Sequence, residues 1–492
     1  MASKLLFDGS DWNFETISNT IIACGEIAKE LKLNTYKNQI EVITSEQMLD
    51  AYASVGLPIM YKHWSFGKRF SKEKDLYKQG KRGLAYEIVI NSDPCISYLM
   101  EENTACTQTL VIAHAAFGHN HFFKNNYLFR QWTDATSIVD YLIFAKNYIE
   151  QCEEKYGEET VRELLDGAHA LMMNGIDRAK RPTKLSLTKE KQKQAERQAY
   201  LQETVNDLWR TLPKSKKEKV IKDDNIFPPT MQENILYFLE KHSPKLESWE
   251  REVLRIVRKL SQYFYPQYQT KVMNEGWASF THYYIMNRLW ETGQINEGSM
   301  LEFLQLHTSV LWQPEFDSPY YSGMNPYYLG FEMFHDIKRI CTTPTEEDRE
   351  WFPNIVDKNW IDVCLDAVAN YRDESFIRQF LSPTLIRKLK LFIVTDISTA
   401  DHYTVNAIHD SLGYKIIREQ LANSYEIDDW CPQIAVTKAD IKGTRELSIR
   451  YKRINGRSLN QSWKQVAMYI HKLWGYPVNI ETDDGAFLGT VQ

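Results

Sequence analysis

The chain has 492 residues, more than one compact core usually holds, and therefore predicts two domains or three. Its formal net charge of −6 gives no electrostatic basis for wholesale nucleic-acid binding, so nucleic acid is not an expected partner. Seven scattered cysteines, an odd number with no CxxC pair, argue against a disulfide framework and for reduced thiols in a cytosolic protein.

No segment of the sequence has the character of a membrane span or a signal peptide. The first residues, MASKLLFDGSDWNF, lack an apolar signal segment. No apolar stretch approaches the roughly 20 residues that a membrane-spanning helix needs. We therefore expect a soluble protein of the cytoplasm, without a membrane span.

The N-terminal part of the sequence predicts two helices and a short strand. Asp11 or Asn13 can cap a helix through TISNTIIACGEIAKELKL, and Ile40–Ala53 predicts a second helix. Tyr86–Asn91 alternates apolar and polar residues, as a short strand does. This strand is interpreted either as an edge that holds an extended substrate or as a plain structural strand.

The segment Val111–Asn126 concentrates three of the twelve histidines, His114, His119 and His121. Its apolar lead-in, TLVIAHAAFG, has the character of a buried helix, where a histidine is costly unless its ring nitrogens find partners. A shared metal ion is one such partner. The alternative is a buried helix whose histidines bond to backbone carbonyls and neighbouring side chains.

Helix geometry limits which of these histidines can share an ion. On an ideal α-helix His114 and His119 lie roughly 140° apart around the axis. His114 and His121 share a face but are separated by about 10 Å along it, too far for one ion. A π-bulge or a C-terminal glycine turn at Gly118 would bring His119 back under His114.

Lysine-rich runs fill residues 177–224, including KRPTKLSLTKEKQKQAERQ and PKSKKEKVIKDD. Such runs are typical of a solvated surface helix or linker, here an insertion in the first domain. An anionic partner is the less favoured interpretation of this segment.

A second polar cluster lies in Met273–Trp290, where Glu275, Ser279 and His282 fall on one helical stripe. Two imidazoles from the first segment and the Glu275 carboxylate would form a three-ligand site with an open position, the arrangement of catalytic zinc. The alternative places Glu275 in the first turn of a helix that Asn274 caps.

From about residue 386 the pattern changes to that of a small α+β domain. Strands are expected at Leu389–Thr395, Gln433–Ile441, Arg445–Ile454 and Val478–Thr482, and helices at Val405–Asn423 and Leu459–Trp474. The histidines here are isolated, so binding or assembly is the expected task of residues 386–492. The candidate site is expected wholly within residues 1–385.

Several of these blocks resemble the SpoVR family, the stage V sporulation protein R-like proteins of bacteria. The matching segments are LPIMYKHWSFGKRF, HAAFGHNHFFKNN, MNEGWASFTHYY, NPYYLGFEMFHDIKRI and FLSPTLIRKLKLF. The resemblance implies an association with sporulation, the spore cortex and stress response. It implies little about chemistry.

A fainter similarity connects the chain to gluzincin-type metallopeptidases through HAAFGHNH, EGWASF and a later Tyr-x-x-Gly segment. It implies that His114, His119 and Glu275 are metal ligands, with Ser279 behind them. Tyr327 or Tyr328 would donate to an oxyanion. Those enzymes have a general-base glutamate where this chain has Ala115, so His121 or His282 would have to accept the proton.

The sequence therefore predicts a mainly α protein with a few short strands, a zincin-like helical first domain and a smaller α+β C-terminal domain. Its predicted cofactor is a divalent metal, zinc first and iron second. The first functional hypothesis is a metal-dependent hydrolase of amide or peptide-type bonds, acting on a peptide or cell-wall precursor. The second is a non-catalytic metal-binding regulator or scaffold with stress-response protein partners. The third is a non-haem iron oxidoreductase.

Overall fold

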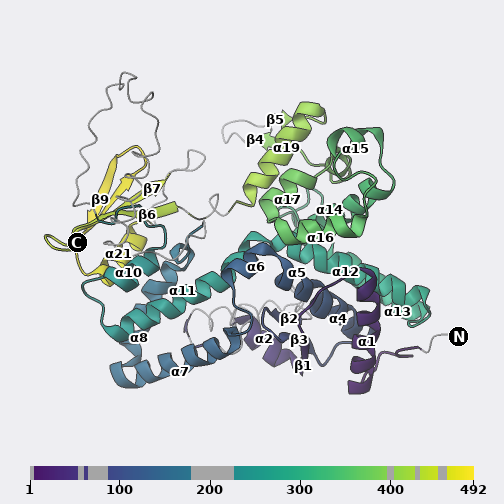
Figure 1. Cartoon of the computed structure of the whole chain (residues 1–492), viewed down its shortest axis with the longest axis horizontal. Coiled ribbons are helices and arrows are strands. Elements are labelled where there is room, and N and C mark those ends of the chain that lie inside the picture. Colours follow the sequence, from purple (N-terminus) through teal and green to yellow (C-terminus); the bar gives the residue numbers. More distant parts are fainter. Residues whose placement is uncertain are drawn as a thin grey trace, which may run out of the picture. The chain divides into compact units, whose positions relative to one another are not determined.

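The computed structural model describes residues 5–53, 60–61, 63–64, 87–178, 227–395, 404–426, 431, 433–452 and 463–492. The chain forms two compact units, drawn in Figure 1: residues 1–166 with 259–431, and residues 167–258 with 432–492. Residues on both sides of position 385 belong to the first unit. Of the predicted charged insertion, only residues 177–178 lie within the described part of the chain.

The first unit is mainly helical. Its elements are α1 (Phe14–Glu30), β1 (Asn38–Ile43), α2 (Ser45–Ala53), β2 (Glu87–Ile90), β3 (Cys95–Met100), α4 (Ala105–Ile112), η1 (Ala113–His119), α5 (Asn120–Asn125), α6 (Tyr127–Trp132), α7 (Ile138–Tyr156), α12 (Lys271–Glu291), α13 (Glu297–Val310), α14 (Pro326–Thr342), α15 (Glu346–Trp351), α16 (Trp360–Asn370), α17 (Asp373–Phe380), α18 (Pro383–Lys388), β4 (Ile393–Thr395), β5 (Thr404–Ala407) and α19 (Ser411–Ser424). Helices α8 (Glu158–Ala170) and α11 (Ser248–Gln269) contain residues of both units.

A three-stranded sheet of order β1-β3-β2 supports the histidine segment. Strand β1 runs parallel to β3, and β2 pairs antiparallel with β3 from Glu87 opposite Leu99 to Ile90 opposite Ile96. Side chains alternate across a strand, so Glu87 shares a face with Val89, which packs against the helical core. Among the described strands, β2 is therefore an edge strand whose first residue faces the helices.

Helix α12 runs through the core of the first unit. Its Trp277 and Phe280 are buried and pack against Phe334 of α14. The backbones of α12 and α14 touch at Gly276 and Gly330: a Cβ on Gly276 would lie 2.3 Å from the carbonyl carbon of Gly330. No other residue fits at this crossing, and the absence of side chains sets how closely the two helices approach.

The second unit is a small α+β assembly. It comprises η2 (Met172–Asn174), α10 (Ile235–His242), β6 (Gln433–Ala439), β7 (Leu447–Lys452), α21 (Trp463–Trp474), β8 (Val478–Thr482) and β9 (Phe487–Val491). Its four-stranded sheet has the order β6-β7-β8-β9, with β7 and β8 parallel and the other pairs antiparallel. Trp474 is fully buried and stacks on Phe238 of α10.

The predicted fold class is confirmed: the chain is mainly α with short strands, and its C-terminal part is α+β. Asn13 caps α1 through a capping box, as one of the two predicted caps. Two predicted helices are wrong in their first turns. Ile40–Ile43 belongs to β1, which pairs with the distant strand β3, and residues 404–407 belong to β5, which pairs with the nearby strand β4.

Within the described residues, no helix combines the length and the apolar character needed to cross a membrane. All seven cysteines are buried and none of them forms a disulfide.

Candidate metal centre

The histidine segment contains a π-helical turn. Between α4 and α5 the seven residues of η1 form a π-helix, and the N–H of Asn120 donates to the carbonyl of Ala115, five residues earlier. In a π-helix residues five apart lie one above the other. His114 and His119 accordingly meet, with ring centroids 4.6 Å apart in an edge-to-face arrangement. Of the two ways the sequence offered to bring these rings together, the π-bulge is confirmed.

Gly118 brings this turn against α12. A Cβ on Gly118 would lie 2.6 Å from the Cα of Ala278, so the two helices touch through their backbones. This contact brings Glu275 to the histidines: its Oε2 is 3.4 Å from Nε2 of His119 and 3.8 Å from Nε2 of His114. The three ligands expected from the sequence thus lie together.

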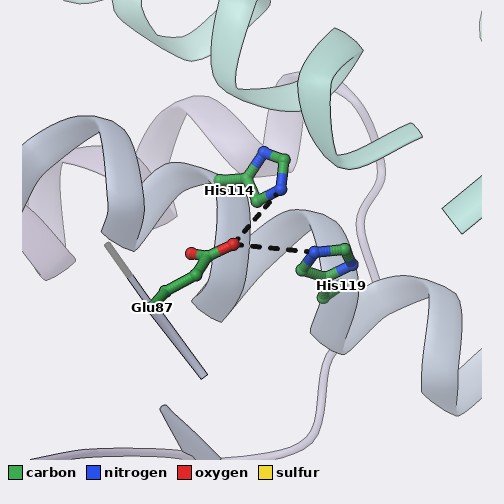
Figure 2. Close-up of side chains that lie close together, drawn as sticks. All are labelled: Glu87, His114 and His119. Atoms are coloured by element: carbon green, nitrogen blue, oxygen red, sulfur yellow. Dashed lines mark ion pairs between the residues drawn. The ribbon is translucent and has the colours of Figure 1, made fainter. Parts of the chain in front are cut away.

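A fourth group, Glu87, comes from strand β2. Its Oε1 lies 3.2 Å from Nε2 of His114 and 3.7 Å from Nε2 of His119, and Figure 2 shows the carboxylate pointing at both rings. The sequence predicts this strand, but Glu87 is not among the predicted site residues. The available signal was a glutamate on the same strand face as Val89, which packs inward.

Three of these groups, Glu87, His114 and His119, could hold a divalent ion, because a ligand atom of each lies within 4.8 Å of the other two. Ligand atoms about 2.0–2.2 Å from a tetrahedral zinc lie about 3.3–3.6 Å from one another. The four nitrogen-to-oxygen distances here are 3.2, 3.4, 3.7 and 3.8 Å. Glu275 Oε2 is also buried with no hydrogen-bond partner among the described residues, although a buried carboxylate needs a cation or several donors. Two imidazoles and two carboxylates are the donors that zinc and iron(II) accept.

The facing imidazoles and carboxylates shift one another's pKa values strongly. Burial is the largest single influence on the pKa of both His119 and Glu275 and disfavours their charged forms, but the facing groups together outweigh it. The pKa of His119 rises to about 9 because the Glu275 and Glu87 carboxylates face it. The pKa of Glu275 falls far below its ordinary value because His119 and His114 face it. Burial raises the pKa of Glu87, an effect that the two imidazoles partly oppose.

Each candidate imidazole ligand has a partner on its other nitrogen. Nδ1 of His119 lies 2.9 Å from Oδ1 of Asn274, so this ring donates there and leaves Nε2 toward the cluster. Nδ1 of His114 lies 2.8 Å from Nδ1 of His282. His282 therefore stands behind His114 rather than beside the carboxylates.

The interpretation of Asn274 as the cap of the second helix is wrong. Helix α12 begins at Lys271, and Glu275 lies within it. The carboxylate of Asp373 accepts from the N–H groups of Val272 and Met273 at 2.9 and 2.8 Å, so a residue distant in sequence caps this end.

The other predicted site residues lie elsewhere in the first unit. Nδ1 of His121 accepts from the N–H of Asn34 at 2.9 Å, and burial lowers the pKa of His121 to about 4. The Ser279 hydroxyl is buried and has no hydrogen-bond partner among the described residues. Tyr328 is half-buried on α14, where burial and the nearby Glu332 raise its pKa. The roles given to these residues and to His282 stay predictions.

Comparisons with known proteins agree with the blocks found in the sequence. A family model described as SpoVR like protein matches residues 11–429, and one described as SpoVR-like C-terminal domain matches residues 432–485. The chain is 54% identical over 483 residues to "Uncharacterized protein YcgB" of Escherichia coli (strain K12), covering 98% of this chain and 95% of that protein. No solved structure matches the chain.

Proposed function

The chain belongs to the SpoVR-like protein family, and on that premise we propose that it is a divalent-metal hydrolase of amide or peptide-type bonds. The observation that carries the proposal is the convergence of His114, His119, Glu275 and Glu87 at 3.2 to 3.8 Å. A peptide or cell-wall precursor is the proposed substrate class. Buried cysteines that form no disulfide suit a reducing compartment, so a cytoplasmic location is part of the proposal.

The residues divide into ligands and a base. His114, His119 and Glu275 hold zinc, and zinc when bound supplies Lewis-acid polarisation of a carbonyl and acidification of water. Glu87 supplies the carboxylate that is absent at position 115. It comes from a strand rather than from the histidine helix, and its carboxylate faces both imidazoles, where it could accept a proton from water at the ion.

A second candidate function is a metal-stabilised regulator or scaffold that works with stress-response proteins. The same distances favour it, because Glu87 lies about as close to the two imidazoles as Glu275 does and would close the zinc site if it bound the ion as a fourth ligand. In that case Glu87 is a permanent ligand and no position is open to a substrate. Iron(II) in this centre would indicate the third function, an oxidoreductase.

Metal binding is tested first. Elemental analysis of the purified full-length protein should find about one zinc per chain, and calorimetry should measure zinc binding to the stripped protein. Glu275→Gln keeps the side-chain shape but removes the charge, and should weaken zinc binding at least about 100-fold, or roughly 2.7 kcal/mol. The matched control is Glu332→Gln, which removes a carboxylate paired with Lys388. Equal zinc affinity of Glu275→Gln and wild type would refute the site.

Hydrolysis is tested with a fluorescence-quenched random peptide library on the zinc-loaded protein. Glu87→Gln should retain zinc and lose the cleavage activity, because only the base is removed. If Glu87→Gln loses its zinc and the wild-type protein cleaves no peptide, the results would instead support the closed, non-catalytic centre.

A further inference from the structure

Three buried histidines form a line that leads away from the candidate metal centre. Nδ1 of His114 on η1 is 2.8 Å from Nδ1 of His282 on α12. Nε2 of His282 is 2.8 Å from Nδ1 of His307 on α13. Each of these contacts is short enough to require one hydrogen between two ring nitrogens.

The tautomer of one ring fixes the tautomer of the next. A neutral imidazole carries its single N–H on one nitrogen and accepts with the other. When Nε2 of His114 gives its lone pair to a metal, the ring's hydrogen lies on Nδ1 and is donated to His282. The hydrogen of His282 then lies on Nε2 and is donated to His307, whose own hydrogen lies on Nε2.

We propose that His282 and His307 are positioning residues that hold the Nε2 lone pair of His114 toward the metal, an inference that rests on the proposed function. The chain reverses when no metal is bound. Nε2 of His114 then carries the hydrogen and donates to Oε1 of Glu87 at 3.2 Å, and His282 and His307 each donate from Nδ1. The reversal relocates one hydrogen on each of His282 and His307, so neither of these two rings gains or loses a proton.

The surroundings favour neutral rings. Burial, with the neighbouring imidazoles, lowers the pKa of His282 well below its ordinary value, and burial lowers that of His307 to about 4. The ring of His307 lies among the rings of Phe331 and Tyr283, with centroids 4.9 and 5.0 Å away. A charged imidazolium gains little in such an apolar setting.

The first test observes the tautomers directly. In ¹⁵N-histidine-labelled full-length protein, the ring nitrogens of His307 should change from an Nδ1–H to an Nε2–H pattern when Zn²⁺ is added. His307 lies behind His282 and does not touch the metal, so a change there reports the chain itself. The same tautomer with and without zinc would overturn the inference.

The second test measures zinc affinity. His307→Leu should raise the zinc Kd about 10- to 100-fold, the usual effect of losing a partner behind a metal ligand. His307→Asn should restore most of the affinity, because its side-chain oxygen can accept from His282. His335→Leu, at an exposed histidine of α14, is the matched control and should leave the Kd unchanged.

The outcomes separate the two proposals. If the wild type binds no zinc, the proposed function fails and the chain's role fails with it. If the wild type binds zinc and His307→Leu binds it equally well, only the positioning role is refuted.

Discussion

Two buried carboxylates, one in each unit, are neutralised in different ways. Glu240 of the second unit is 2% exposed, and fixed cations meet both of its oxygens. Its Oε1 lies 2.8 Å from Nζ of Lys241 and 3.1 Å from Nε of Arg255, and its Oε2 lies 3.0 Å from Nε of Arg258. Burial opposes ionisation of Glu240, but these cations lower its pKa.

Among the residues that the structure describes, Glu275 of the first unit has no lysine or arginine partner. Its nearest cationic groups are two imidazoles at 3.4 and 3.8 Å, and both also face the carboxylate of Glu87. The distances exceed those of good hydrogen bonds, although they suit atoms that share an ion. The protein's own side chains therefore complete the Glu240 cluster, whereas under our proposal a dissociable metal ion completes the Glu275 cluster.

The largest expected effect is a loss of folding stability when Glu240 is removed from its cluster of cations. Glu240→Ala leaves the guanidinium groups of Arg255 and Arg258 without their buried partner, so the free energy of unfolding should fall by about 3–5 kcal/mol. Chemical denaturation of the metal-free protein measures this loss. Zinc affinity of the folded variant should be unchanged, and a drop in zinc affinity would contradict the separation of the two clusters.

A smaller loss of stability is expected at the helix crossing beside the metal centre. Gly276→Ala forces a Cβ against the backbone of Gly330, so α12 must move away from α14 at a cost of about 1–3 kcal/mol. Thermal unfolding measures the loss. Gly298→Ala, at an exposed position in the first turn of α13, is the matched control and should not destabilise. Equal melting temperatures for the two variants would show that the crossing tolerates a methyl group.

The smallest expected effect is the change in zinc affinity per pH unit, and it concerns only the cluster that contains His119 and Glu275. The pKa of His119 is raised to about 9, so at pH 7 zinc must displace a proton from this ring. Apparent zinc affinity should therefore rise about tenfold per pH unit from pH 6 to 8 and level off near pH 9. Calorimetry in buffers of different ionisation enthalpy counts the released proton. Affinity that is flat across this range would mean that His119 is not a ligand.

The sequence predicted much of this site because its signals are local. His114 and His119 lie in one apolar segment with Gly118 between them, and the π-turn was one of two predicted ways to bring the rings together. Helix α1 was predicted from its capping residue in the same way. Where a few consecutive residues determine the local structure, the sequence pattern was enough to predict it.

The missing parts depend on contacts between segments distant in the chain. Glu87 reaches the histidines only because β2 pairs with β3 beside η1, and its place on the strand face of Val89 does not by itself identify it as a ligand. His307 joins His282 only through the packing of α13 on α12. The helix expected at Ile40–Ala53 begins as a strand for the same reason, because β1 pairs with β3 from a distant part of the chain.

The glycine contacts have a consequence for the choice of ion. His119 follows Gly118 and Glu275 precedes Gly276, so both donors sit next to points where main chains touch directly. With no flexible side chains between the helices, the opening between these donors cannot widen easily. Such an aperture suits ions with bonds of about 2.0–2.2 Å and disfavours calcium, whose bonds to oxygen are about 2.3–2.6 Å.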